Sequence, residues 1–303
     1  MNKKNKSYSI SFIYIIITII FIFFVIHLLL NNNIENFVNN DNYILPKTVY
    51  VYWDNLDGND IIQAHINTIS RNLNSDWNLL VLTKKNIDNY IDPIFLNKFK
   101  YLNSVRFSDF LRLELLSKNG GVWMDAGTIL INGDFLDKYY NEMIQKKADV
   151  LLYELNDHST PKQPYLENWF LMAPKNSLFI NDLYNEFIKS FDMDFINYKF
   201  NVLAPVITFD KIMKGKNNTY HMQHGIINYL LLINKNKYKI IIKDANESMF
   251  KAQKKNNWNS DNLIKYIIEN NDWNDYYAIK LVNFNRKSIT PFKDDFINKL
   301  NSL

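Results

Sequence analysis

The sequence predicts an α/β domain with a mostly parallel central sheet, preceded by one transmembrane helix. The helix is predicted from an uncharged apolar run, Tyr8 to Leu30. The α/β domain is predicted because β-branched and aromatic runs alternate with segments of helical periodicity from Thr48 onward. A length of 303 residues, with 47% hydrophobic and 22% charged residues, is sufficient for a full core.

Composition limits the chemistry that the chain can perform. There is no cysteine, so disulfides, thiolate metal sites and thiol nucleophiles are excluded, and a metal ion has to be held by oxygen or by one of the five histidines. The 35 basic and 31 acidic residues leave a net charge of only +4 and form no basic stripe. We therefore expect no nucleic-acid partner.

The N-terminal segment is expected to anchor the chain in a membrane. As a helix, Tyr8 to Leu30 is longer than the hydrocarbon core of about 30 Å, and also longer than the apolar part of a signal peptide, about 7–15 residues. Lys3, Lys4 and Lys6 precede it, and acidic residues follow it, which predicts a type II orientation. The expected organisation is a cytoplasmic tail (1–7), a transmembrane helix (8–30), a stem (31–46) and a lumenal or extracytoplasmic domain (47–303), in an ER- or Golgi-like endomembrane for a eukaryote or virus.

The domain is expected to begin with a β-α-β unit. A strand at 48–53 ends at Asp54-Asn55, a helix at 61–69 follows, and a second strand is expected at 77–82. The remaining expected elements are helices at 87–100, 107–117, 135–147, 178–191 and 226–232, and strands at 122–124, 128–131, 149–154 and 169–172. Asp125 directly follows a strand, and ligands of parallel sheets bind beyond the carboxyl ends of strands.

One stretch of the chain resembles a known family. From Phe107 to Thr128 it reads FSDFLRLELLSKNGGVWMDAGT, which is similar to the capsular polysaccharide synthesis proteins, relatives of the sugar-binding glycosyltransferases that include α-mannosyltransferases and glucosylating toxins. The residues that match the family pattern are Ser108, Asp109, Arg112, Gly120, Gly121, Trp123 and Asp125. Weaker likenesses lie at 46–53, 168–170 and 278–281. The resemblance implies a GT-A-like nucleotide-sugar-binding fold.

The resemblance also implies roles for individual residues. Asp125 would bind the metal ion, and Asp125 and Arg112 would act in catalysis. The residues that would bind the nucleotide-sugar donor are Tyr52, Trp53, Asp109, Arg112, Gly120 and Gly121. Glu154 and Asn168 are candidates for contact with the sugar or the acceptor.

The expected cofactor is Mn²⁺ or Mg²⁺. Loss of the sugar leaves negative charge on the diphosphate, and a divalent cation held by carboxylate oxygens can neutralise it. Asp125 can supply one carboxylate. The general family motif, aspartate-any-aspartate, has a second one, but Gly127 occupies that position here. This departure puts coordination by two carboxylates in doubt.

Each of these residues also has an ordinary structural interpretation. Asp109 and Arg112 are spaced for an intrahelical ion pair, and Gly120 and Gly121 are typical of a helix C-cap. Strand-end tryptophans such as Trp53 are often core residues. His221 and His224 would share a helical face as metal ligands, but we prefer a surface turn that closes at Gly225.

The predicted function is metal-assisted transfer of a sugar, a hexose, from a nucleotide-sugar donor to a glycan or polysaccharide hydroxyl, with retention of anomeric configuration. An alternative is a catalytically inactive, membrane-anchored protein that binds a sugar or a nucleotide, which Gly127 motivates. A membrane hydrolase with paired carboxylates is a third option, supported only by the abundance of aspartate.

Overall fold

The computed structural model describes residues 43–303, apart from 161, 210, 211 and 216. Residues 44–303 form one unit. The predicted transmembrane helix at 8–30 lies outside the described residues, as do residues 31–42 of the predicted stem. In the part that is described, none of the helices combines the length and the apolar character needed to cross a bilayer. The membrane anchor therefore stays a prediction.

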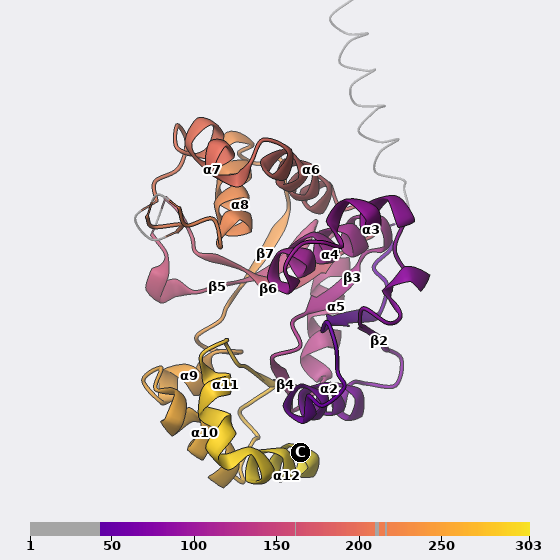
Figure 1. The fold of residues 1–303 in the computed structure, drawn as a ribbon, viewed down its shortest axis with the longest axis vertical. Helices are drawn as coiled ribbons and strands as arrows, with labels where there is room; N and C mark the ends of the chain where they lie inside the picture. Colours follow the sequence, from indigo (N-terminus) through magenta and orange to yellow (C-terminus); the bar gives the residue numbers. More distant parts are fainter. Residues whose placement is uncertain (1–42, 161, 210–211, 216) are drawn as a thin grey trace, which may run out of the picture. The chain divides into compact units, whose positions relative to one another are not determined.

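A six-stranded sheet forms the centre of this unit, in the order β2-β1-β3-β6-β5-β7 (Figure 1). The strands are β1 (Thr48–Tyr52), β2 (Asn78–Leu82), β3 (Gly121–Met124), β5 (Val150–Glu154), β6 (Leu166–Ala173) and β7 (Ile240–Asp244). Only β6 pairs antiparallel with its neighbours, so the other strands of this sheet all point the same way. The α/β class and the mostly parallel sheet are thus confirmed.

The first part of the unit folds as the sequence predicts. Helix α2 (Asp60–Asn72) connects β1 to β2, and the Asn59 side chain caps its first turn by accepting a hydrogen bond from the Ile62 N–H. The next predicted helix, 87–100, is interrupted. A 3₁₀ turn, η1 (Ile87–Asn89), precedes α3 (Pro93–Phe99), because proline at the first helical position cannot donate a backbone hydrogen bond.

Helix α4 (Ser104–Asn119) leads directly into β3. Its residues from Phe107 to Ser117 are buried, except for Ser108, and it packs against α6 (Leu178–Asp192). The helix ends at Gly120, whose φ of 70° is the left-handed conformation that glycine adopts without a penalty. The end of α4 and the length of β3 together determine where Asp125 emerges from the sheet.

Further helices flank the sheet. They are α5 (Asp134–Lys146), α7 (Phe195–Tyr198) and α8 (Met222–Ile233), with the short turns η2 (Asn156–His158) and η3 (Lys199–Leu203). Figure 1 shows α6, α7 and α8 together in one region of the unit. Aromatic and aliphatic side chains of α4, α6 and α8 form the largest core cluster with β1, β3 and β6.

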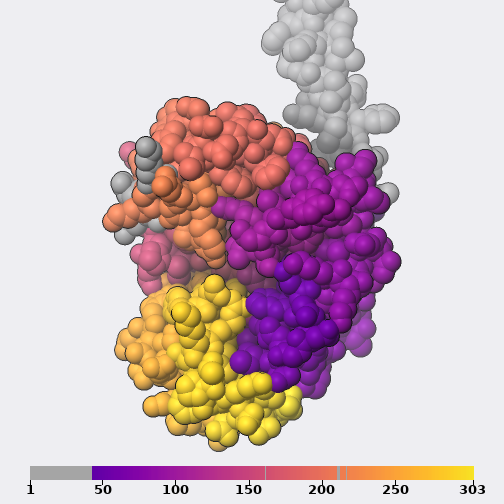
Figure 2. All heavy atoms as spheres, viewed as in Figure 1, coloured from indigo at the N-terminus to yellow at the C-terminus, as the bar shows by residue number. Residues whose placement is uncertain are grey.

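The C-terminal segment forms a second layer that the sequence did not predict. It contains α9 (Lys251–Lys255), α10 (Ser260–Glu269), β8 (Ala278–Lys280), α11 (Asn285–Ile289), η4 (Thr290–Phe292) and α12 (Lys293–Ser302). Strand β8 pairs antiparallel with β4 (Thr128–Leu130), and α12 packs on α2. In Figure 2 this layer (yellow) lies against the earliest part of the unit (indigo). The Arg71 side chain joins the two by donating a hydrogen bond to the Leu300 carbonyl, at 2.6 Å.

Candidate active site

A cavity of about 800 Å³ opens at the carboxyl ends of β1 and β3. Its walls come from segments that are far apart in the sequence: 52–55, 104–112, 123–127, 165–169, 220–224 and 280–286. In Figure 2 the indigo, violet, orange and yellow parts of the chain meet near the middle of the view. A cavity of this size and position is typical of ligand sites in α/β proteins.

Asp125 lies in this cavity, at the turn that follows β3. Its Oδ1 accepts hydrogen bonds from Trp123 Nε1 at 2.9 Å and from Arg112 Nη2 at 3.3 Å, and its Oδ2 lies 3.3 Å from Lys280 Nζ. Burial raises the pKa of Asp125, but the positive charges of Lys280 and Arg112 outweigh this and hold the pKa below its ordinary value. Asp125 is therefore ionised at neutral pH.

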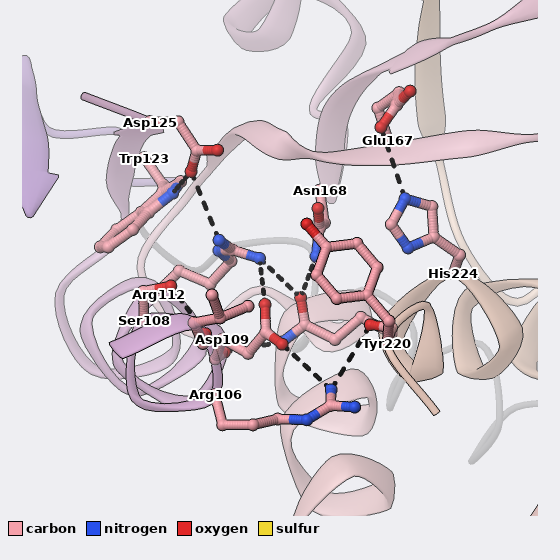
Figure 3. A network of polar contacts seen from close by, with 12 residues as sticks. Arg106, Ser108, Asp109, Arg112, Trp123, Asp125, Glu167, Asn168, Tyr220 and His224 are labelled. Carbon is pink, nitrogen blue, oxygen red and sulfur yellow. Dashed lines mark hydrogen bonds and ion pairs between the residues drawn. The ribbon is translucent and has the colours of Figure 1, made fainter. Parts of the chain in front are cut away.

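Arg112 connects Asp125 to a second carboxylate on the same helix (Figure 3). Its Nη1 donates to Asp109 Oδ1 at 2.7 Å, and Arg106 Nη1 donates to the other Asp109 oxygen at 3.2 Å. Burial raises the pKa of Asp109, against the effect of the two arginines. The predicted intrahelical pair exists, and it is one part of a larger network.

Gln223, which the sequence did not single out, extends the network to β6. Its Oε1 accepts from Arg112 Nη1 at 3.1 Å and from Asn168 Nδ2 at 2.7 Å, and its Nε2 donates to the Asp109 carbonyl at 2.6 Å. Asn168, the predicted contact for the sugar or the acceptor, thus lines the cavity with its amide group fixed by Gln223.

Two further cations, which the sequence analysis did not identify, line the cavity. Lys280 Nζ donates to the Leu281 carbonyl at 3.0 Å besides pairing with Asp125. The Arg286 guanidinium lies 5.0 Å from the centre of the Trp53 ring. Burial lowers the pKa of both cations. The weak likeness at 278–281 was the only signal for Lys280, and Arg286 had none.

Gly127 closes the turn that begins at Asp125. A Cβ atom at this position would lie 2.8 Å from the Leu281 carbonyl oxygen and 3.3 Å from Lys280 Nζ. The Leu281 N–H donates to the Gly127 carbonyl at 2.8 Å, which holds the two backbones together. A second carboxylate would not fit at this position without moving the segment that carries Lys280.

Tyr52 and Trp53, which the sequence predicts as donor-binding residues, both line the cavity. Tyr52 is 5% exposed, and its hydroxyl donates to Asp54 Oδ1 at 2.5 Å, so it contributes mainly to the wall. Trp53 is half-buried, and the Arg286 guanidinium covers its ring. An aromatic ring and a guanidinium stacked in this way present flat faces to a planar ligand.

His221 and His224 do not form a surface turn, so the preferred interpretation was wrong. Both lie at the start of α8 and line the cavity, and Gly225 is inside the helix. His224 is 5% exposed, and its Nε2 lies 3.4 Å from the buried Glu167. Burial lowers the pKa of His221 to about 4, with help from the positive charge of Arg106. Helix α8 begins at Met222, four residues before the start expected from the sequence, residue 226.

The structure does not bring three of the predicted residues to the cavity. Gly120 and Gly121 lie at the opposite end of β3 from Asp125, where added Cβ atoms would meet the Lys175 N at 2.4 Å and the Thr48 carbonyl oxygen at 2.8 Å. This close backbone packing leaves no room for a nucleotide beside the two glycines, so their donor-binding role stays a prediction without support from their surroundings. Glu154 ends β5 and is not among the residues that line the cavity.

The donor set around Asp125 is poorly suited to Mn²⁺ or Mg²⁺. Both oxygens of this carboxylate face positive side chains, and glycine stands where a second carboxylate would. Among the residues that the structure describes, no group of three or more His, Cys, Asp or Glu side chains is placed to hold a metal ion. Metal binding by Asp125 therefore stays a prediction, without support from the side chains around it.

Several solved structures are similar to this chain at low identity. The glycosyltransferase GlyE of Streptococcus pneumoniae TIGR4 is similar at 9% identity and a TM-score of 0.43, over 85% of this chain and 63% of that chain. The galactosyltransferase LgtC, in complex with donor and acceptor sugar analogs, is similar at 8% identity and a TM-score of 0.39, over 84% and 96%. The PaToxG glycosyltransferase is similar at 12% identity and a TM-score of 0.39, over 63% and 70%.

No curated protein matches the chain. A family model does, and its description is "Capsular polysaccharide synthesis protein". The match runs from residue 21 to residue 277 and includes the Phe107–Thr128 stretch that first suggested the resemblance. Because it covers most of the chain, this protein belongs to the capsular polysaccharide synthesis protein family.

Proposed function

We propose that this chain is a glycosyltransferase that moves a hexose from a nucleotide-sugar donor to a hydroxyl group of a glycan or polysaccharide. Besides the family membership, one structural observation supports the proposal. Arg112, Lys280 and Arg286 converge in a cavity at the carboxyl ends of the strands, where a diphosphate would complement their charge. We also interpret the fold as GT-A-like, because the family resemblance implies it.

The nucleotide is placed at the Trp53 side of the cavity. The base would stack on the Trp53 ring or on the Arg286 guanidinium that covers it. The diphosphate would then lie between Arg286 and Lys280, because both cations belong to the same 280–286 segment of the wall. In this arrangement Asp109 acts through Arg112, since both Asp109 oxygens are already held by arginines.

The sugar and the acceptor are placed at the β6 side. Glu167 and Asn168 are adjacent on this strand, and both line the cavity. A carboxylate and an amide are suitable partners for sugar hydroxyl groups. Glu167 therefore replaces the predicted Glu154 in this role.

Charge stabilisation is the main contribution of these residues to catalysis. Negative charge develops on the diphosphate as the bond to the sugar breaks, and cations already fixed in the cavity stabilise it more than bulk solvent does. Retention of configuration is part of the proposal because the family resemblance implies it. So is the type II anchor, which the Tyr8–Leu30 run and the three preceding lysines support.

Donor hydrolysis tests the proposal. The full-length chain, purified in mild detergent, is incubated with UDP-, GDP- and CDP-sugars, with and without Mn²⁺, and release of the free sugar is measured. We expect one donor to be hydrolysed, and Asp125→Asn to slow this by roughly 100-fold, because Lys280 and Arg112 lose the carboxylate that positions them.

Asp57→Asn is the matched control. Asp57 is an exposed carboxylate, paired with Lys85 and absent from the cavity wall, so its loss should leave hydrolysis unchanged. The alternative, an inactive binding protein, predicts a different pattern. It would bind a nucleotide but hydrolyse no donor, and the Asp125→Asn variant would be indistinguishable from the parent.

A further inference from the structure

We propose that the ammonium group of Lys280 takes the place of a divalent cation in this site, so that the chain uses its donor without a metal ion. The inference rests on the proposed function and concerns the charge that the leaving diphosphate meets. It goes against the Mn²⁺ or Mg²⁺ that the sequence predicts. Three features of the cavity support it.

The first feature is the position of Lys280. Its side chain is 8% exposed, and its Nζ lies 3.3 Å from Asp125 Oδ2. Arg112 and Trp123 donate to the other oxygen of this carboxylate, Oδ1. An ammonium group has three N–H donors. In the described part of the chain its oxygen partners are Asp125 and the Leu281 carbonyl, which leaves one N–H for a ligand in the cavity.

The second feature is the space around Gly127. The position that carries the second aspartate of the general family motif is glycine here, and its missing Cβ would lie 3.3 Å from Lys280 Nζ. The lysine therefore fills the space that a side chain at 127 would enter. A buried cation therefore lies where a second carboxylate at 127 would have stood.

The third feature is the local balance of charge. Asp125 is shared by Lys280 and Arg112, and Arg286 lies near enough to interact with the same carboxylate. A divalent cation bound to Asp125 would stand beside these positive groups and be repelled by them. A diphosphate, in contrast, would be attracted by all of them. Around Asp125 the cations thus outnumber the carboxylates before any ion binds, since Arg112, Lys280 and Arg286 stand against Asp109 and Asp125.

The chemical step is balanced without a metal. The bond between the anomeric carbon and the β-phosphate oxygen breaks, and its electron pair stays on that oxygen. The acceptor hydroxyl oxygen bonds to the anomeric carbon, and its proton passes to the leaving diphosphate. Lys280 remains protonated throughout and supplies positive charge, in the manner of other cations that stabilise phosphoryl leaving groups.

Calorimetric titration of the full-length chain with UDP, GDP and CDP tests the inference. One series contains EDTA and a second contains MnCl₂. We expect one nucleoside diphosphate to bind with affinities that agree within about threefold between the two series. Binding that requires Mn²⁺ would overturn the inference and leave the proposed function standing. Absence of binding in both series would overturn both.

Two lysine variants provide a second test. Lys280→Met keeps the length of the side chain and removes its charge, and we expect it to weaken diphosphate binding by about 30-fold or more in EDTA, because a charge-assisted contact is lost. Binding of the corresponding nucleoside, which has no phosphate, should stay the same. Lys287→Met, at an exposed position of α11, should change neither affinity.

The nucleoside titration separates a contact with the diphosphate from a merely structural role. A collapsed cavity would weaken the nucleoside and the diphosphate alike. Equal diphosphate affinity in Lys280→Met and the parent chain would overturn the inference. Should Lys280→Met fail to fold, as judged by its thermal unfolding, the comparison of EDTA with MnCl₂ decides alone.

Discussion

Arg112 is the residue on which the arrangement of the site depends most. It is 5% exposed on its side chain, and its two terminal nitrogens reach Asp109 and Asp125 at 2.7 and 3.3 Å. Its guanidinium also lies 5.2 Å from the centre of the Trp123 ring. A lysine has no planar fork and cannot make these contacts at once.

Removing Arg112 should destabilise the protein more than removing the whole pair. In Arg112→Met the buried Asp109 carboxylate loses its nearest cation, and we expect the free energy of unfolding to fall by about 3–5 kcal/mol. The double variant Asp109→Asn, Arg112→Met no longer buries a carboxylate at position 109, and Arg106 still has an amide oxygen to donate to, so it should recover part of this loss. Urea unfolding measures both. A double variant less stable than Arg112→Met would contradict the explanation.

His65 should make the stability of the protein depend on pH. It is fully buried, and its Nδ1 lies 3.2 Å from the Ala126 carbonyl, which only accepts, so the neutral ring carries its proton on Nδ1. Burial lowers the pKa of His65 to about 4, from an ordinary value of 6.5. Between these values the unfolded chain binds a proton that the folded chain does not, so stability falls as pH falls.

The expected loss attributable to His65 is about 2 kcal/mol between pH 7.5 and pH 5. His65→Gln keeps an amide donor for the Ala126 carbonyl but cannot titrate. The free energy of unfolding, measured by urea titration at both pH values, should therefore fall less in this variant than in the parent chain. The difference between the two losses should be about 2 kcal/mol. Equal losses in the two proteins would assign the pH dependence to other groups.

At the scale of elements, the reversed direction of β6 brings its first residues to the site. Met124 at the end of β3 pairs with Phe170 in the antiparallel ladder, so the residues that precede Phe170 lie beyond the carboxyl end of β3. As a result, Glu167 and Asn168 line the same cavity as Asp125. An all-parallel sheet would have put them at the other edge.

The two glycines between α4 and β3 belong to the scaffold. Gly120→Ala should cost more than 3 kcal/mol, because the new Cβ combines a left-handed backbone with a 2.4 Å approach to the Lys175 N. Gly58→Ala is the matched control. Its φ of 69° is the same, but nothing lies within 4 Å, so only the backbone strain of about 1 kcal/mol remains.

Thermal unfolding of the two glycine variants gives the comparison. The affinity of the folded fraction for nucleoside diphosphate provides a second readout. We expect it to be unchanged in Gly120→Ala, since the cavity lies at the other end of β3. Weaker nucleotide binding with unchanged stability would restore the donor-binding role that the sequence predicted.

At the scale of the whole unit, the C-terminal layer holds one wall of the site in place. Strand β8 carries Lys280 and is joined to β4, while Phe296 and Leu300 of α12 pack in one buried cluster with Ile129 and Ile279. Lys280 can meet Asp125 only because this cluster fixes β8 against the turn at Gly127. Packing of α12 is thus connected to the charge of the cavity.

Phe296→Ala should therefore affect both stability and function. Phe296 is completely buried, and its truncation should lower the free energy of unfolding by about 3–5 kcal/mol. Phe200→Ala, at a residue that is 42% exposed, should cost less than about 1 kcal/mol. Chemical unfolding measures the two losses. Nucleotide affinity should fall in the Phe296 variant at temperatures where it stays folded, and remain normal in the Phe200 variant.

The sequence by itself determined the family, the α/β class and most elements up to residue 233. These follow from local information: strand and helix periodicity within short segments, and the contiguous Phe107–Thr128 stretch, in which neighbours in the sequence are neighbours in the site. It was less successful where competing local signals met, as at Pro93. The Ile240–Ile242 run, a strand signal that the sequence carried, was overlooked.

Only the tertiary structure decided which distant residues share the cavity and which predicted ones do not. The reversed β6, the start of α8 and the C-terminal layer converge at one edge of the sheet, so that the cavity of Asp125 also contains Lys280, Arg286, Glu167 and His224. Gly120 and Gly121 lie outside the cavity although they are close to Asp125 in sequence, because strand β3 is extended and they are at its other end. Spacing along the chain cannot reveal either fact, since burial and charge depend on neighbours that only the packed sheet brings together.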